Sequence, residues 1–152
     1  MKFFALSGLI LLLGCSACKK DDQVNDQAVA MNVNQVPYDI AEVNLEVVSG
    51  TRVNGNTLRI TIFGNNGART RFYDLATSPK AYDPLDNNHI EYLDFQENPY
   101  AVTFGRLELT DVELVNDKYQ VSGNFYFTGY SITTNDSVRV NSGFITSLKQ
   151  TN

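Results

Sequence analysis

The sequence contains no cysteine after residue 18, no tryptophan and only one histidine, His89. The main part of the chain therefore cannot form a disulfide bond or a thiolate metal site. Any Ser-His-Asp or multi-histidine chemistry would have to centre on His89, which follows two asparagines at a loop-strand junction where an exposed polar residue is ordinary. We therefore predict no catalytic residue, no metal site and no cofactor.

Positive charge is also scarce, because 12 Lys and Arg residues face 17 Asp and Glu residues for a formal net charge of −5. An acidic surface disfavours nucleic acid as a partner, since the phosphate backbone is itself negative. The chain has no Gly-rich phosphate loop after a strand and no Gly-x-Ser-x-Gly motif. The sequence predicts no nucleic-acid partner.

A long apolar run occurs only at the start, where Phe3 to Leu13 is interrupted by Ser7 and Gly8 and preceded by Lys2. A spanning helix needs roughly 20 apolar residues, so this run is too short for one. A basic start, an apolar run and small residues before a cysteine are typical of a secretory signal. We predict a lipoprotein signal peptide over residues 1–17.

The cysteine that ends this signal resembles the bacterial lipoprotein box, in which a nucleophilic sulfur accepts diacylglycerol. Cys18 follows the small residues Ser16 and Ala17, whereas Cys15 has the bulky Leu13 two positions before it. We predict that Cys18 is acylated, with Cys15 as the alternative. Several acyl chains on one cysteine would hold the protein on outer-membrane lipid.

The residues after Cys18 are similar to the Cys-x-Lys-Asp-Asp signal that Bacteroidota use to place lipoproteins on the outside of the outer membrane. Lys20, Asp21 and Asp22 have the matching offsets from Cys18. This resemblance implies an outer-membrane protein that faces the cell surface, with the periplasmic side as the alternative.

Residues 18–35 are polar with little periodicity, which predicts a flexible tether with a reach on the order of 20–25 Å. The alternative is a first strand or short helix within Val24–Val33, where three valines are spaced apart. From residue 36 onward, apolar residues recur with period two, as in half-buried strands. Asn54-Gly55 and Asn66-Gly67 supply the positive φ angles of hairpin turns. The clearest alternating apolar residues are Val43, Leu45, Val47, Leu58, Ile60, Ile62, Tyr119, Val121, Phe125 and Phe127.

Further features extend this pattern to the end of the chain. Residues 77–88 read as a loop, 89–96 as a strand, and 101–115 as an extended segment with a bulge at Gly105 and a bend near Asp111. In 137–148 the residues Val138, Val140 and Phe144 are predicted to share one face. We predict an all-β domain over 36–152, either a single antiparallel β-sandwich or a partly open barrel of seven to nine strands.

The segments Val121–Thr128 and Val138–Phe144 are similar to the carboxy-terminal signature of a family of small Bacteroidota lipoproteins whose domain has no known function. That signature reads aliphatic-Ser-Gly-x-Phe-x-Phe and then a valine-rich strand. Tyr38 stands where the family usually has Trp, and Asn124 where it usually has Thr. The resemblance implies a fold and a location, and no established activity.

Tyrosines are the candidate ligand contacts, because exposed rings stack on sugars or anchor protein partners. Tyr126 lies on the polar side of a predicted strand and Tyr130 near its end, while Tyr82 and Tyr100 lie beside prolines. The alternative is that these rings pack at the edges of a core that has no tryptophan.

Two acidic sets support other hypotheses. Residues 83–88 offer oxygen ligands for calcium but lack the Gly and the closing Glu of an EF-hand loop. A carboxylate pair could hydrolyse glycans, as in glycosidases. Candidates for such a pair are Glu91, Asp94, Glu97, Asp111 and Glu113.

The sequence thus favours a non-catalytic binding or accessory module of the cell envelope that contacts a protein complex or a glycan. The alternatives are a glycan hydrolase that uses two carboxylates and a structural or immunity lipoprotein. A hydrolase requires two carboxylates in one concave site, whereas a binding module requires a contiguous exposed aromatic patch.

Overall fold

The computed structural model describes residues 28–50, 55–84 and 89–151, and in these ranges the chain is all-β, as predicted. Ten antiparallel strands are present, and no helix in this part of the chain is long and apolar enough to cross a membrane. The strands are β1 Val29–Val33, β2 Val36–Pro37, β3 Ile40–Val48, β4 Thr57–Gly64, β5 Arg69–Leu75, β6 Lys80–Tyr82, β7 Ile90–Leu93, β8 Pro99–Val115, β9 Lys118–Ser131 and β10 Asp136–Lys149.

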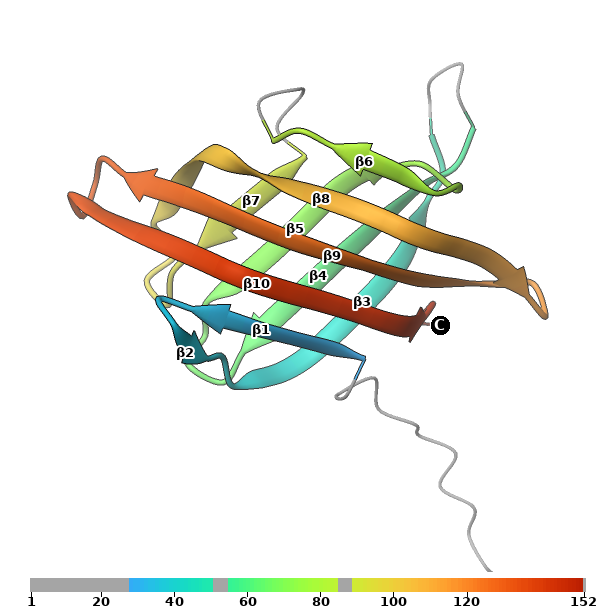
Figure 1. The fold of residues 1–152 in the computed structure, drawn as a ribbon, viewed down its shortest axis with the longest axis horizontal. Helices are drawn as coiled ribbons and strands as arrows, with labels where there is room; N and C mark the ends of the chain where they lie inside the picture. Colours follow the sequence, from blue (N-terminus) through green and yellow to red (C-terminus); the bar gives the residue numbers. More distant parts are fainter. Residues whose placement is uncertain (1–27, 51–54, 85–88, 152) are drawn as a thin grey trace, which may run out of the picture.

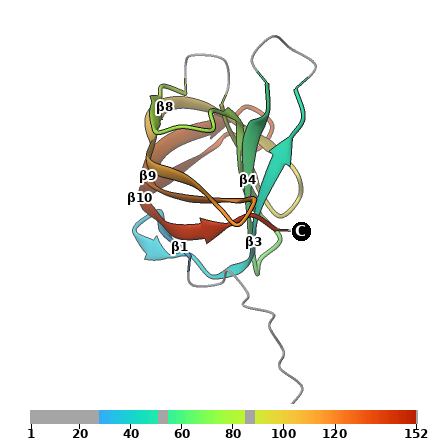
Figure 2. The ribbon, with the colours of Figure 1, turned by 90° about the vertical axis from the view of Figure 1, so that its right-hand side faces the viewer.

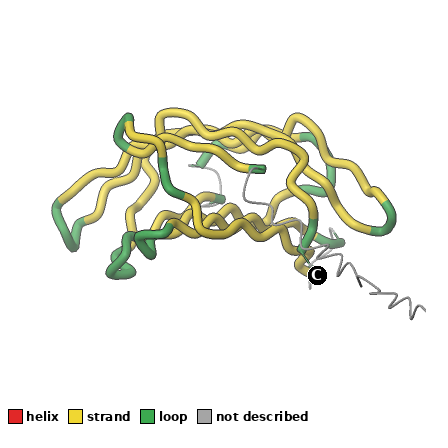
Figure 3. The backbone as a smooth tube through the Cα atoms, turned by 90° about the horizontal axis from the view of Figure 1, so that it is seen from below, coloured by secondary structure: helices red, strands yellow, loops and turns green. Residues whose placement is uncertain are grey.

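The strands form one curled sheet in the order β2-β1-β10-β9-β8-β7-β5-β4-β3, with β6 added beside β8. Strands β1, β10, β9 and β8 form one layer, and β7, β5, β4 and β3 form the other (Figure 1). The two layers face each other across the core (Figures 2 and 3), so the sheet is a half-barrel.

Strand β8 connects the layers, because its first two residues pair with β7 and residues 101–115 pair with β9. At the opposite side, the backbone N–H of Thr151 donates to the carbonyl of Leu45 at 2.9 Å. The segment after β10 thereby contacts β3 and partly closes the curl. The two layers are therefore joined at one side by β8 and at the other by the segment after β10, and both cover the same core.

Alternation places the apolar side of each strand between the layers. Leu58, Ile60 and Ile62 of β4 are fully buried, and the ring of Phe72 on β5 meets the ring of Phe125 on β9 with centroids 4.9 Å apart. This edge-to-face pair joins one layer to the other and contributes about 0.5–1.5 kcal/mol beyond the burial of its area. The core thus lies between the two layers of the one curled sheet, and the outer face of each layer is left to solvent.

Two glycines let strands approach closely in the layer of β8, β9 and β10. A Cβ at Gly123 would lie 2.3 Å from the carbonyl oxygen of Glu108, and one at Gly143 would lie 2.2 Å from the ring of Phe125. No other residue fits these positions without a shift of the backbone or ring.

The structure extends the domain into the segment predicted as a tether. Residues Val29–Val33 form β1, which pairs with β10 through Val29↔Ile145 and Ala30↔Phe144. The assignment of residues 29–35 to a tether is therefore wrong, and the alternative of a first strand holds. The side chains of Val29 and Met31 are buried in the core, which explains why this short polar-looking segment is ordered.

Smaller differences concern the middle of the chain. The predicted loop at 77–88 contains β6, which pairs with β8, and β7 is shorter than the predicted strand at 89–96. Pro99 begins β8 at a position that pairs with Leu93. Register shifts occur between Val102 and Phe104 and between Leu109 and Asp111, close to the predicted bulge and bend.

Phe144 lies on the outer face, contrary to the prediction that it shares the inner face with Val138 and Val140. The register with β9 shifts between Val140 and Gly143, so an extra residue enters β10 there. Because side chains alternate with period two, one inserted residue moves those after it to the other face. Ile145 consequently takes the buried position.

Candidate binding surfaces

The four tyrosines predicted as ligand contacts divide into two buried and two exposed rings. Tyr82 and Tyr100 retain 4% and 8% of their accessible surface, whereas Tyr126 and Tyr130 retain 37% and 41%. The expectation of an exposed ring is therefore wrong for Tyr82 and Tyr100.

Pairing within the sheet explains the burial of these two rings. Tyr82 ends β6, pairs with Leu107 and accepts a hydrogen bond at its hydroxyl from the backbone N–H of Ala76. Tyr100 pairs with Tyr92, and the two rings pack edge to face with centroids 5.3 Å apart. Each ring fills core volume, as the alternative of edge packing proposed.

Phe104, Tyr126 and Phe144 are exposed rings on neighbouring strands of the outer face of β8, β9 and β10, and we call these three the aromatic row. Phe104 and Phe144 are 62% and 57% exposed, and the rings of Phe104 and Tyr126 lie 5.8 Å apart. Phe144 pairs with Asn124, which is two residues from Tyr126 on the same face of β9. The row therefore runs diagonally across three neighbouring strands.

The outer face of the other layer carries a grid of polar side chains. Cross-strand register places Asn44, Thr61, Arg71 and Glu91 side by side on β3, β4, β5 and β7. The short Thr61 lies among longer neighbours, so it forms the floor of a depression of about 310 Å³, which we call the polar hollow. Its lining consists of Asn44, Glu46, Arg59, Thr61, Phe63, Arg71 and Tyr73.

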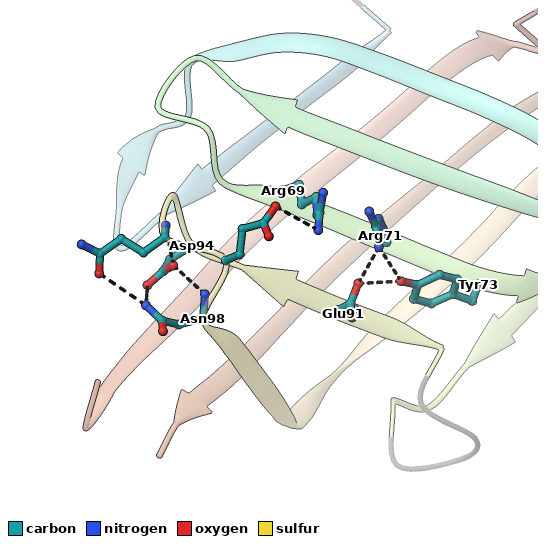
Figure 4. Close-up of polar contacts among 8 residues, drawn as sticks. Arg69, Arg71, Tyr73, Glu91, Asp94 and Asn98 are labelled. Carbon is teal, nitrogen blue, oxygen red and sulfur yellow. Dashed lines mark hydrogen bonds and ion pairs between the residues drawn. The ribbon is translucent and has the colours of Figure 1, made fainter. Parts of the chain in front are cut away.

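Arg71, Tyr73 and Glu91 form a hydrogen-bonded group at the edge of the polar hollow (Figure 4). The Tyr73 hydroxyl donates to Glu91 Oε2 at 2.5 Å, and Arg71 Nη1 donates to the same oxygen at 3.2 Å and to the Tyr73 hydroxyl at 3.3 Å. Partial burial, followed by the bond to Glu91, raises the pKa of Tyr73. The phenol is therefore a neutral donor that fixes Glu91 and Arg71 in place.

Arg59 also lines the polar hollow, next to Tyr73. Its guanidinium lies 5.7 Å from the centre of the Tyr73 ring and 3.5 Å from the Glu46 carboxylate. The side chain is 40% exposed, while its Nε–H is buried and has no hydrogen-bond partner among the described residues. An unpaired buried donor costs about 1–3 kcal/mol. The exposed part of this side chain consists of its other atoms.

A second depression, of about 630 Å³, shares Tyr73 with the polar hollow and also borders Glu91. Its other wall includes Tyr130 and Ile132, the latter 87% exposed. It lies beside the point where β8 leaves β7 to pair with β9. Of the four predicted tyrosines, the largely buried Tyr100 and the exposed Tyr130 line this depression, whereas Tyr126 lies on the outer face of β9 away from it.

The five candidate carboxylates are spread over three places. Glu91 is paired with Arg71, and Glu97 lies 3.5 Å from Arg69. Asp111 and Glu113 are exposed near the far end of β8.

Asp94 closes a turn by accepting hydrogen bonds from the backbone N–H of Gln96 and from Asn98. Figure 4 shows the contacts with Asn98. Desolvation acts to raise the pKa of Asp94, but these bonds outweigh it and lower the pKa. A general acid for glycan hydrolysis needs a raised pKa instead, so Asp94 has the properties of a turn residue.

His89 packs into the structure. Its ring lies 4.9 Å from that of Tyr82, and Nδ1 is 2.9 Å from the carbonyl oxygen of Tyr73. No group of three or more His, Cys, Asp or Glu residues that could hold a metal occurs in the described ranges. Positions 85–88 of the acidic loop considered for calcium lie outside those ranges.

The predicted lipidation and export residues lie in the segment 1–27, outside the described residues. They are Cys18, its alternative Cys15, and Lys20, Asp21 and Asp22.

The structure defines a small antiparallel β domain with one outer face that carries exposed rings and one that carries a polar hollow. The chain matches the family model described as "Domain of unknown function (DUF6252)" over residues 25–149, and it therefore belongs to this family. No curated protein and no solved structure matches the chain. The match begins before β1, in agreement with the inclusion of that strand in the domain.

Proposed function

We propose that this protein is an outer-membrane lipoprotein of the Bacteroidota cell envelope, and that its β domain is a non-catalytic accessory module of an envelope protein complex. Acyl chains on Cys18 anchor it, and Lys20, Asp21 and Asp22 direct it to the cell surface. The short apolar signal and the small residues before Cys18 support the anchor.

The aromatic row is the observation that carries the binding role. Three rings on an uncovered sheet face expose apolar surface that a folded domain normally buries. Burying one such ring fully against a partner contributes about 1.5–3 kcal/mol. Aromatic side chains and Arg are enriched at the centres of protein interfaces, and Arg106 pairs with Tyr126 beside the row. A protein partner fits this surface.

The anchor is tested by fractionating cells that express single-cysteine variants. Cys18→Ala is expected to release the protein from the membrane fraction, while Cys15→Ala leaves it bound. Mass spectrometry of the mature protein should find acyl chains on Cys18. An unacylated chain that still carries Met1 would overturn the lipoprotein assignment, and protection from protease added to intact cells would place the domain on the inner side.

The binding role is tested by affinity purification from solubilised membranes. A variant with Phe104→Ser, Tyr126→Ser and Phe144→Ser should lose a protein that co-purifies with the wild type. Phe95→Ser is the matched control, because Phe95 is 65% exposed outside the row. Equal recovery of the same proteins with wild type, control and triple variant would exclude the aromatic row as the contact surface.

A further inference from the structure

We propose that the polar hollow on the outer face of β3, β4, β5 and β7 binds one neutral sugar unit of a glycan. The hollow has a volume of about 310 Å³ and is open to solvent on a face that no other part of the described chain covers. The site lies in the other layer from the aromatic row, so this proposal does not depend on the protein partner proposed above.

The pairing register of β3, β4 and β5 explains why the sheet has a hollow at this position. Thr61 is opposite Asn44 on β3 and opposite Arg71 on β5. Its short side chain is 6% exposed because the longer side chains of its neighbours rise around it. A ligand that enters the hollow therefore meets a hydroxyl floor with polar walls on both sides.

The walls of the hollow provide both hydrogen-bond donors and hydrogen-bond acceptors. Arg59 and Arg71 are donors, Glu46 is an acceptor, and the amide of Asn44 is both. Sugar hydroxyl groups donate and accept at each carbon of the ring, so they match such a mixed lining. Apolar ligands would leave these groups unpaired, which disfavours them.

Charge balance selects a neutral ligand over an acidic one. Arg59 lies 3.5 Å from Glu46, and Arg71 lies 3.2 Å from Glu91. Each cation therefore has its own carboxylate, and the carboxylate of an acidic sugar would face repulsion from both Glu46 and Glu91. A neutral pyranose can accept from the guanidinium groups without displacing either ion pair.

Aromatic side chains add a surface for the C–H face of a sugar ring. Tyr73 and Phe63 both line the hollow, and Tyr73 also borders the second depression, which extends to Tyr130. A chain of several sugar units can therefore pass over Tyr73 from one depression to the next. This geometry predicts tighter binding of neutral oligosaccharides than of their single sugars.

The test uses the full chain, purified in detergent, against immobilised short oligosaccharides of glucose, mannose and galactose and against matched uronic acid oligomers. Binding to at least one neutral series, and weaker binding to the uronic acids, is the expected result. Binding to none of the neutral series, or a preference for the acidic series, would overturn the proposal.

Thr61→Leu fills the floor of the hollow and is expected to weaken neutral-glycan binding about tenfold or more by steric exclusion. Thr128→Leu makes the same change on the outer face of β9 and should leave binding unchanged. A second variant, Asn44→Ala, removes one polar contact without adding bulk and should weaken binding severalfold, with Asn124→Ala on β9 as its control. Unchanged binding in Thr61→Leu and Asn44→Ala, with circular dichroism showing folded protein, would place the sugar elsewhere.

Discussion

The outer faces of the two layers differ in composition, although side chains alternate between the inner and the outer face in the strands of both layers. The layer of β8, β9 and β10 carries exposed rings in the aromatic row, and the layer of β3, β4, β5 and β7 carries paired Arg and Glu side chains around a hollow. The inner faces are alike, since both are apolar and both pack on the Phe72–Phe125 contact. The difference shows that packing of the core constrains only one side of each strand, and that the outward sides of the two layers can therefore differ in composition.

Neighbouring residues on β9 provide the sharpest separation of inner from outer face. Phe125→Ala should lower the free energy of unfolding by about 3–5 kcal/mol, because it opens a cavity between the layers. Tyr126→Ala, one residue later and exposed, should change it by about 0.5 kcal/mol or less. Chemical denaturation measures both values, and similar losses in the two variants would contradict the assignment of faces.

A smaller effect is expected from filling the close approach between β8 and β9. Gly123→Ala places a methyl group against the carbonyl oxygen of Glu108 and should cost about 1–3 kcal/mol of unfolding free energy. Asn124→Ala, on the outer side of the same strand, serves as the control and should be nearly neutral. If thermal melts show no difference between these variants, the strands are not as close as described.

High pH should weaken the packing of Tyr92 on the inner face. Burial, and then the nearby Tyr100, raise the pKa of Tyr92 from 10.0 to about 12. The stability that neutral Tyr92 contributes is fully present below pH 10 and is lost as pH rises through about 12. Tyr92→Phe should make unfolding free energy less dependent on pH in this window. Chemical denaturation at several pH values measures the unfolding free energy, and tyrosinate absorbance reports the ionisation. The same pH dependence in wild type and Tyr92→Phe would argue against this role for Tyr92.

The smallest expected effect concerns the polar side of the other layer. Tyr73→Phe keeps the ring but removes the hydroxyl that bonds Glu91 and Arg71, which should cost about 0.5–1.5 kcal/mol of unfolding free energy. Solvent exposure of this group favours the lower end of that range. Tyr126→Phe is the control, because the hydroxyl of this exposed ring has no hydrogen bond to the described residues, and it should cost less. A larger loss in the control would show that the hydrogen-bonded group at the hollow is not ordered.

Alternation alone predicted the strands that have one strongly apolar side, such as β4 and β9, and also which of their residues are buried. It did not predict β1, because Val29 and Met31 are too few to distinguish a strand from a polar tether. The exposure of Phe144 depends on a bulge in β10. The sequence signal for this change of face is Ile145, an apolar residue whose parity is opposite to that of Val138 and Val140.

The candidate surfaces were less predictable than the fold. The outward side of Arg59 and Thr61 was visible in the pattern of β4, but only the pairing of β4 with β3 and β5 brings Asn44 and Arg71 beside them. Pairing between strands far apart in sequence is set by the whole fold and leaves no local signal. The burial of Tyr82 also follows from a partner strand, β8.

Photo-crosslinking in intact cells tests the central claim, that the aromatic row contacts a protein partner, most directly. A photoreactive amino acid in place of Tyr126 should yield one discrete, larger crosslinked species. The same amino acid in place of Phe95 should yield none. Absence of the species at position 126, or its presence at both positions, would contradict the proposed interface.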